Sequence, residues 1–296
     1  IKLKHSIPLY ILLFPSILLL ILFSYLPMLG LIIAFKDYSP ANGIFASQWV
    51  GFKYFTQFFS SFQFGTTMFN TLKISLYSIV VGFPLPIILA IISNQLRVGK
   101  FRKIFQVTTY LPHFISTMVM CGMIILFLSP TSGLLANVFK SVGITIPDFL
   151  SKPSHFAGVY VWSDVWQHIG WDSIIYLAAL SAIDPTYYEA ATMDGASRLQ
   201  KIRHIELPLL LPTAMILLIL RAGSLLSVGF EKVLLLQNPL NLAGSEIIST
   251  YVYKVGMVNF QYSYSTAIGL FNTVVNLIIL LSVNWFSKRY TRTGLF

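Results

Sequence analysis

The sequence predicts an all-α, polytopic membrane protein with six transmembrane helices. Two observations carry this prediction. First, 56% of the 296 residues are hydrophobic and only 10% are charged, whereas soluble domains carry about 25% charged residues. Second, the Lys and Arg residues gather in short clusters between long apolar runs, which is typical of membrane topology signals. The chain therefore lacks the polar surface that a water-soluble globule of this length needs.

The lengths of the apolar runs predict the individual helices. About 20 apolar residues are needed for a helix to cross the hydrocarbon core. The first run is too long for a cleavable signal peptide. Pro84, Pro86 and Pro112 predict kinks, whose freed backbone groups neighbouring helices must satisfy. We predict the six spans near residues 8–33, 71–93, 105–128, 157–181, 207–229 and 263–286.

The placement of basic residues orients these helices. If both termini are cytoplasmic, the cytoplasmic segments hold twelve of the 20 Lys and Arg residues and the external loops hold six. Basic residues favour the cytoplasmic side, so we predict this orientation. The same placement argues against nucleic acid as the reason for the net charge of +10. The predicted cytoplasmic segments are 1–7, 94–104, 182–206 and 287–296.

One cytoplasmic segment is unusually charged. Residues 187–212 read YYEAATMDGASRLQKIRHIELPLLLP and hold six charged side chains within 18 positions. Asp184 and Pro185 predict a helix start, and Asp194-Gly195 predicts its end. A second helix should follow, with Pro208 marking the entry into span five. The residues alone leave two interpretations open: an amphipathic interfacial helix, or a docking platform for a cytoplasmic partner.

This segment resembles the EAA loop of ABC importer permeases. The matching residues are Glu189-Ala190-Ala191, Asp194-Gly195-Ala196, Ile205 and Leu207-Pro208, with Pro212 beyond them. The resemblance extends to WVGFKYFTQFF at 49–59 and to residues 174–191 and 250–284, so it covers nearly the whole chain. It implies a type I importer transmembrane domain with a cytoplasmic coupling helix. The expected division is 1–68 for the first helix and external loop, and 69–296 for the core, with the EAA loop at 182–208.

The resemblance also implies partners and roles. The loop would fit a cleft on an ATP-hydrolysing subunit and transmit its closure to the membrane helices. Expected partners are two such subunits, a second related permease chain (or a second copy of this one), an external solute-binding protein and the lipid of a bacterial cell membrane. The central docking residues would be Glu189, Ala190, Ala191 and Gly195, bracketed by Asp194 and Arg198.

The expected cargo is a carbohydrate. The C-terminal region resembles a subgroup that imports oligosaccharides, including uronate oligomers, although a short sugar or a sugar phosphate stays open. Asp164, His168 and Asp172 are spaced i, i+4 and i+8, so a helix places them within about 80° of one another, with Trp171 on the same face. Carboxylates and an imidazole suit sugar hydroxyls, and an indole suits a sugar ring. An alternative is that this part of span four lies at the outer interface.

Two further polar positions are candidates. Glu231, near the outer end of span five, would meet the delivered substrate. Arg221, inside span five, must face protein or water, either in a structural pair or toward substrate. Asn272 and Asn276 in span six are expected to bond across helices.

Several function classes are disfavoured. The chain has no G-x-x-x-x-G-K-[ST] phosphate loop, so we expect no enzyme activity of its own and ATP hydrolysis in a separate subunit. Cys121 is the single cysteine, and we expect no metal and no cofactor. An intramembrane enzyme or an ion-gradient-driven secondary transporter would use Asp164, His168 and Asp172 instead; the transporter is the alternative function.

Overall fold

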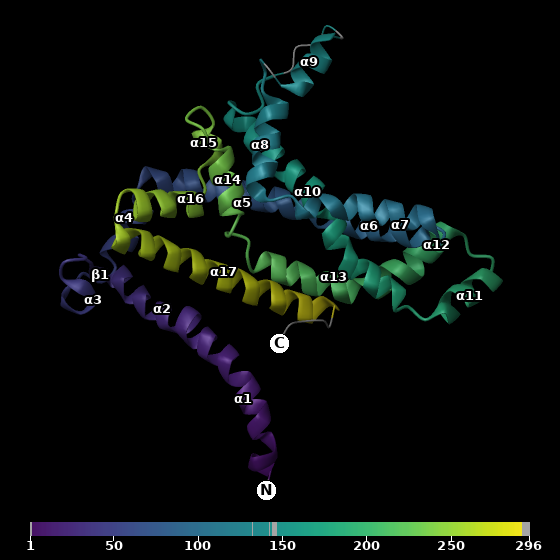
Figure 1. The fold of residues 1–296 in the computed structure, drawn as a ribbon, viewed down its shortest axis with the longest axis horizontal. Coiled ribbons are helices and arrows are strands. Elements are labelled where there is room, and N and C mark those ends of the chain that lie inside the picture. The colour runs from purple at the N-terminus through teal and green to yellow at the C-terminus, as the bar shows by residue number, and fades with distance from the viewer. Residues whose placement is uncertain (1, 132, 142, 144–146, 292–296) are drawn as a thin grey trace. The chain divides into compact units, whose positions relative to one another are not determined.

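The structure, a computed structural model, describes residues 2–131, 133–141, 143 and 147–291, and it is helical almost throughout (Figure 1). The chain divides into two compact units. The first, here called the N-terminal unit, comprises Ile1–Phe64 and Tyr251–Thr273. The second, the core unit, comprises Gly65–Thr250 and Val274–Phe296. The expected boundary at residue 68 stays a prediction.

The N-terminal unit joins a long apolar helical segment to a small aromatic core. Its first elements are α1 (Lys2–Leu20), the π-helical η1 (Ile21–Tyr25), α2 (Leu26–Met28), the 3-10 helix η2 (Leu29–Phe35), β1 (Lys36–Asp37), α3 (Gly43–Ala46), β2 (Gln48–Trp49) and α4 (Lys53–Phe59). The two strands pair antiparallel, with Lys36 opposite Trp49. Phe58 is 1% exposed. Its ring packs among those of Phe59, Phe64, Tyr251, Tyr264 and Phe271.

The core unit holds most of the remaining helices. They are α5 (Phe62–Gly82), α6 (Pro84–Gln95), α7 (Lys100–Tyr110), η3 (Leu111–Phe114), α8 (Thr117–Leu128), α9 (Leu134–Ser141), α10 (Pro153–Ser181), α11 (Pro185–Met193), α12 (Arg198–Lys201), the π-helical η4 (Ile202–Glu206), α13 (Leu207–Ala222), α14 (Phe230–Leu236) and α15 (Leu242–Ser245). The chain continues through α16 (Ile248–Tyr253), η5 (Lys254–Val258) and α17 (Tyr262–Thr291), whose last part returns to this unit.

Helix α10 is the centre of the core unit. It packs against α6, α7, η3, α13 and α15, and it runs alongside α6 and α7 (Figure 1). Both apolar and polar side chains along it are buried, including Tyr160, Gln167 and Ser173. Gly170 lets α7 approach closely, because a Cβ there would lie 2.0 Å from the carbonyl oxygen of Thr109. The most polar predicted span therefore packs against several other helices of the core unit.

The six predicted spans are matched in part. By length and apolarity, four helical segments of the described chain could cross a membrane: Tyr10–Phe35, Phe62–Gln95, Arg198–Ala222 and Tyr262–Arg289. A fifth is the pair Lys100–Phe114 and Thr117–Leu128, which meet at an angle of 97°. We expected one span at 105–128. The structure instead has two helices there, joined at a sharp bend. α10, the predicted fourth span, is not among these segments, and the count of six stays a prediction.

The helix breaks expose backbone carbonyls that side chains then satisfy. Pro86 has no N–H, so the carbonyl of Gly82 has no partner within its helix. The guanidinium of Arg221 donates to it at 2.9 Å. At the bend between η3 and α8, the amide of Gln167 donates to the carbonyl of Ile115 at 2.8 Å. The expected kink near Pro112 is confirmed by the 97° bend, and at Pro84 and Pro86 the helix is interrupted between α5 and α6. The Gly82 carbonyl is satisfied from another helix, as expected.

The fifth predicted span ends earlier than expected. α13 stops at Ala222 rather than near residue 229, because Gly223 lies against Leu280 of α17 and the chain then turns. Residues 223–229 are irregular, and their backbone groups bond to side chains. The Leu226 N–H donates to Asn276 Oδ1 at 2.9 Å, and the Ser75 hydroxyl donates to the Leu225 carbonyl. Asn276 therefore bonds across helices, as predicted.

The close approach at Gly170 gives a testable prediction. Gly170→Ala would force a methyl group into the α7 backbone, and overpacking of this kind costs about 1–3 kcal/mol or more. We expect a clearly lower melting temperature of the detergent-purified protein. Gly158→Ala on the same helix is the matched control, since a Cβ there meets nothing within 4 Å. Equal melting temperatures for the two variants would contradict the close packing of α7 on α10.

Candidate functional site

The charged loop begins with a capped helix. Asp184 Oδ1 accepts hydrogen bonds from the Thr186 N–H at 2.9 Å and from the Thr186 hydroxyl at 2.6 Å. These bonds lower the pKa of the Asp184 carboxyl below its usual value. Pro185 occupies the first helical turn, where a missing N–H costs no hydrogen bond. The predicted start of the helix at Asp184-Pro185 is confirmed.

The helix ends where the sequence predicts. α11 ends at Met193, and Gly195 adopts φ +73°, a conformation that favours glycine. The Ala196 N–H then closes the turn on the Ala191 carbonyl at 2.8 Å. Ser197 and Gln200 form a capping box that starts the next helix. The turn at Gly195 thus sets the direction of α12 relative to α11.

The motif residues form an open surface. Glu189, Ala190, Asp194, Gly195 and Arg198 are exposed, and Ala191 is half-buried. Within the described residues, the Glu189 side chain makes no hydrogen bond or ion pair. In Figure 1, α11 lies beyond the ends of α6 and α12. The structure brings these residues together on one short helix and turn, and their docking role stays a prediction.

The second helix of the loop is not a separate element. α12, η4 and α13 run as one helical segment, Arg198–Ala222, which continues past Pro208. The π-helical turn Ile202–Glu206 ends two residues before Pro208. A π-helical turn uses i to i+5 hydrogen bonds, so it changes which backbone groups pair just before the proline. Pro208 lies in the first turn of α13, as expected for the entry into span five, but the second helix of the loop joins that span without a break. α12 is thus continuous with the predicted fifth span.

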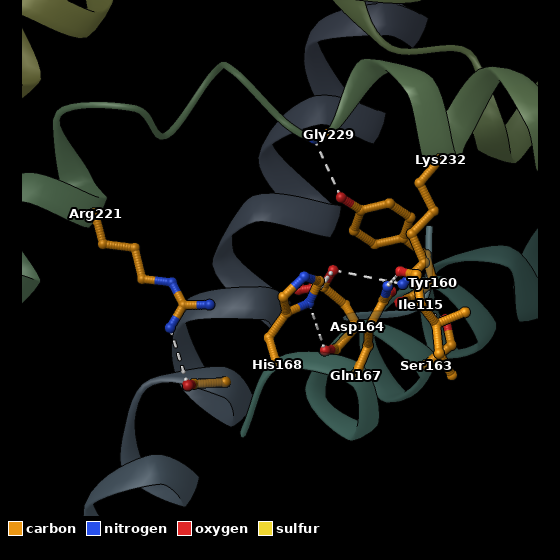
Figure 2. Close-up of polar contacts among 10 residues, drawn as sticks. Ile115, Tyr160, Ser163, Asp164, Gln167, His168, Arg221, Gly229 and Lys232 are labelled. Carbon is orange, nitrogen blue, oxygen red and sulfur yellow. Dashed lines mark hydrogen bonds and ion pairs between the residues drawn. The ribbon is translucent and has the colours of Figure 1, made fainter. Parts of the chain in front are cut away.

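The second candidate region is the polar face of α10. The carboxylate of Asp164 accepts from Lys232 Nζ at 3.4 Å and lies 3.4 Å from His168 Nδ1 (Figure 2). Tyr160, one turn away, accepts the Gly229 N–H through its hydroxyl at 3.1 Å. As predicted, Asp164, His168 and Asp172 share one face, and all three line a small gap beside Arg221.

Lys232, one of the six basic residues assigned to the external loops, is buried within the core unit. It is 4% exposed, and its ammonium lies 5.2 Å from the centre of the Tyr160 ring. Its predicted external position stays a prediction. A buried ammonium needs a counter-ion, and Asp164 supplies it. Glu231, its neighbour, is exposed in the first turn of α14 and is not part of this cluster. The pattern of one Lys and one Asp in adjacent apolar segments was the signal that sequence reasoning missed.

Two cavities meet at Arg221. One has a volume of about 160 Å³ and is lined by hydroxyl groups, including those of Ser75, Ser224 and Tyr160, together with Asp164. The other, of about 270 Å³, is lined by Asp172, Tyr176 and apolar side chains. Arg221 lines both. The one hydrogen bond of its guanidinium within the described chain goes to the Gly82 carbonyl and not to an acid. The guanidinium therefore lines one hydroxyl-rich cavity and one that is mainly apolar but contains Asp172.

Trp171 is the candidate whose surroundings differ most from expectation. One face of its indole stacks on the imidazole of His113, with ring centres 4.4 Å apart and planes 2° apart. Phe114 meets it edge-on. The indole is 43% exposed, so only part of it can contact another molecule. His113, which also lies near His168, was not singled out from the sequence, although it directly follows the noted Pro112.

Metal binding is not indicated by this cluster. Across residues 2–131, 133–141, 143 and 147–291, no three His, Cys, Asp or Glu side chains lie close enough to hold a metal ion. Carboxylate, imidazole, hydroxyl and guanidinium groups together can donate to and accept from a polar, hydroxyl-rich molecule.

The Asp164–Lys232 pair predicts a specific pattern of stability. Asp164→Ala would leave the Lys232 ammonium buried without a partner, which typically costs about 3–5 kcal/mol. The double variant Asp164→Ala with Lys232→Met should recover most of this loss, because no buried charge remains. Melting temperatures in detergent measure both. A double variant as unstable as the sum of the single variants would show that the two groups do not interact.

Comparison with known proteins identifies the family. Residues 82–292 match the family described as binding-protein-dependent transport system inner membrane component. Protein LplB of Bacillus subtilis is 41% identical, over 99% of this chain and 92% of its own. The polygalacturonan/rhamnogalacturonan transport system permease protein YteP of the same organism is 39% identical, over 100% of this chain and 92% of its own.

A solved structure agrees along the whole chain. In the crystal structure of a bacterial alginate ABC transporter in complex with an alginate pentasaccharide-bound periplasmic protein, one chain superposes with a TM-score of 0.92. It is 41% identical, and the match covers 99% of this chain and 98% of that one. The motif at 189–208, the helical architecture and these similarities lead to one conclusion: the chain belongs to the binding-protein-dependent transport system inner membrane components.

Proposed function

We propose that this chain is a membrane-spanning subunit of an ATP-driven importer for an acidic oligosaccharide. The observation that carries the proposal is α11. It presents the EAA residues on an exposed helix, without a partner for Glu189 in the described chain, at the end of a helical core like that of an alginate ABC transporter. The small side chains of Ala190 and Ala191 let a partner surface approach the backbone of α11 closely, and Glu189 beside them supplies a charge for it to contact.

The proposed mechanism is alternating access. Both termini lie in the cytoplasm in this proposal, and α10 and the bent pair α7–α8 complete six spans with the four apolar helical segments. Two ATP-hydrolysing subunits dock on α11 of this chain and on its counterpart in a second permease chain. Their closure displaces α11, and Gly195 passes the displacement to the segment Arg198–Ala222. A ligand or nucleotide shifts a conformation only through contacts that differ between states, and α11 would supply them.

The proposed substrate pathway follows the polar face of α10. Asp164, His168, Asp172 and the exposed part of Trp171 would contact sugar hydroxyls and rings, and Glu231 would meet the substrate delivered by the binding protein. Arg221 adds a cation that lines two cavities, one with Asp164 and hydroxyl groups and one with Asp172. A guanidinium binds carboxylates well, and two of the similar proteins handle polygalacturonan and alginate, which are acidic. This favours an acidic cargo over a neutral one.

The function is tested by uptake into proteoliposomes that contain the complete complex. We expect uptake of labelled alginate or polygalacturonate oligomers to require ATP, the ATPase subunits and the binding protein. Neutral oligosaccharides of the same length serve as the control for charge. A protonophore should leave uptake unchanged at constant ATP. Collapse of uptake with the proton gradient, without ATP dependence, would favour the ion-driven alternative.

The docking role of α11 makes a separate prediction. Glu189→Lys reverses the charge at the centre of the surface and should lower ATP-driven uptake by at least tenfold, equivalent to about 1.4 kcal/mol of coupling. Capture of the loaded binding protein should stay intact. Lys100→Glu, an exposed charge reversal in the predicted cytoplasmic segment 94–104, is the control and should transport normally. Normal uptake by Glu189→Lys would contradict the docking role.

A further inference from the structure

Glu206 is a fully buried acid at the start of span five. It is 0% exposed and lies in the π-helical turn Ile202–Glu206. No cation lies within ion-pair distance of it among the described residues. A buried carboxylate is costly unless hydrogen bonds satisfy it. Its position in a turn that only re-spaces the helix before Pro208 does not explain why an acid is needed there.

Three donors from two other elements converge on one of its oxygens. Oε1 of Glu206 accepts from Gln95 Nε2 at 2.8 Å, from Asn94 Nδ2 at 3.1 Å and from the Tyr188 hydroxyl at 3.3 Å. Asn94 and Gln95 lie at the C-terminal end of α6, and Tyr188 lies on α11, next to Glu189. One carboxylate therefore joins the coupling helix, span two and span five.

The other oxygen is equally buried but has no hydrogen-bond partner in the described structure. An unsatisfied buried acceptor raises the energy of the state that contains it. A different arrangement of α6, α11 and α13 that supplied a donor to Oε2 would be favoured over the present one. The carboxylate thus keeps one oxygen free to accept a further hydrogen bond.

Few other side chains connect α11 to the membrane helices. Within the described chain, two side chains of α11 hydrogen-bond to later elements: Tyr188 donates to Glu206 and lies beside Asn94, and Thr192 accepts from Lys201 at 2.7 Å. The Lys201 link leads to α12 alone, whereas the Glu206 link also leads to α6. Partial burial and the negative Glu206 raise the pKa of Tyr188 to about 12, so its hydroxyl stays a donor at neutral pH.

We propose that Glu206 is the positioning residue that passes a displacement of α11 to α6 as well as to span five. The inference rests on the proposed coupling function of α11 and names the side chains that carry it. Without this junction, α11 would still move α12 through the continuous backbone. Span two would no longer follow, and ATP hydrolysis would be separated from sugar movement.

The test is the number of sugar molecules transported per ATP hydrolysed by the reconstituted complete complex. Tyr188→Phe removes the hydroxyl that links α11 to Glu206 and to Asn94 of α6. We expect it to lower this ratio about tenfold, as for one lost hydrogen bond to a charged group, with assembly and ATP hydrolysis retained. Tyr187→Phe is the matched control, because Tyr187 is the adjacent residue, is 58% exposed and should keep the wild-type ratio.

Two variants at Glu206 complete the test. Glu206→Gln keeps an acceptor for the three donors and should retain most of the coupling ratio. Glu206→Leu leaves all three donors buried without an acceptor and should lose it. If Glu206→Leu does not assemble, the pair Tyr188→Phe and Glu206→Gln still decides the question.

The outcomes separate the two levels of the proposal. The positioning role would be overturned if Tyr188→Phe kept the wild-type ratio of sugar transported to ATP hydrolysed. It would also be overturned if every variant lost assembly, hydrolysis and transport together at a constant ratio. In either case Glu206 would be only a structural acid. If the wild-type complex itself shows no ATP-dependent uptake, the proposed function fails first, independently of Glu206.

Discussion

The structure depends on one constraint: inside a bilayer, each backbone N–H and C=O must find its partner within the protein. At three helix breaks of the core unit, a polar side chain from another helix bonds the exposed backbone group. Arg221 bonds the Gly82 carbonyl, Gln167 bonds the Ile115 carbonyl, and Asn276 bonds the Leu226 N–H. The polar residues of this apolar chain are thus placed first by the needs of its own backbone.

The same constraint explains the central place of α10. A helix with Asp164, His168 and Asp172 is costly in contact with lipid, and it is instead surrounded by α6, α7, α13 and α15. Irregular backbone beside such a helix is tolerated where it is buried in protein or lines a cavity, and most of residues 223–229 line the hydroxyl-rich cavity. This cavity therefore follows from the early end of the helix of span five, and a site for a hydroxyl-rich cargo becomes compatible with a membrane-embedded fold.

Local chemistry was predictable from the sequence, and long-range pairing was not. Asp184, Pro185 and Gly195 set the ends of α11 through bonds to their immediate neighbours, so their roles could be inferred. The early end of span five and the burial of Lys232 depend on Leu280 and Asp164, which are distant in sequence. The 97° bend after His113 was foreseen only as a kink at Pro112. In the sequence, Glu206 is only one of six charged residues in the loop. Its role could not be predicted, because the partners that define it lie on α6 and α11.

The central claim is that this chain works as the membrane partner of an ATP-hydrolysing subunit. The most direct measurement is purification of the chain from native membranes in mild detergent, with mass spectrometry of the proteins that remain bound. The account predicts an ATPase subunit and a second permease chain in the complex. Recovery of this chain alone, or as a homodimer without an ATPase, would contradict it and make the carboxylates of α10 the leading candidates for ion coupling.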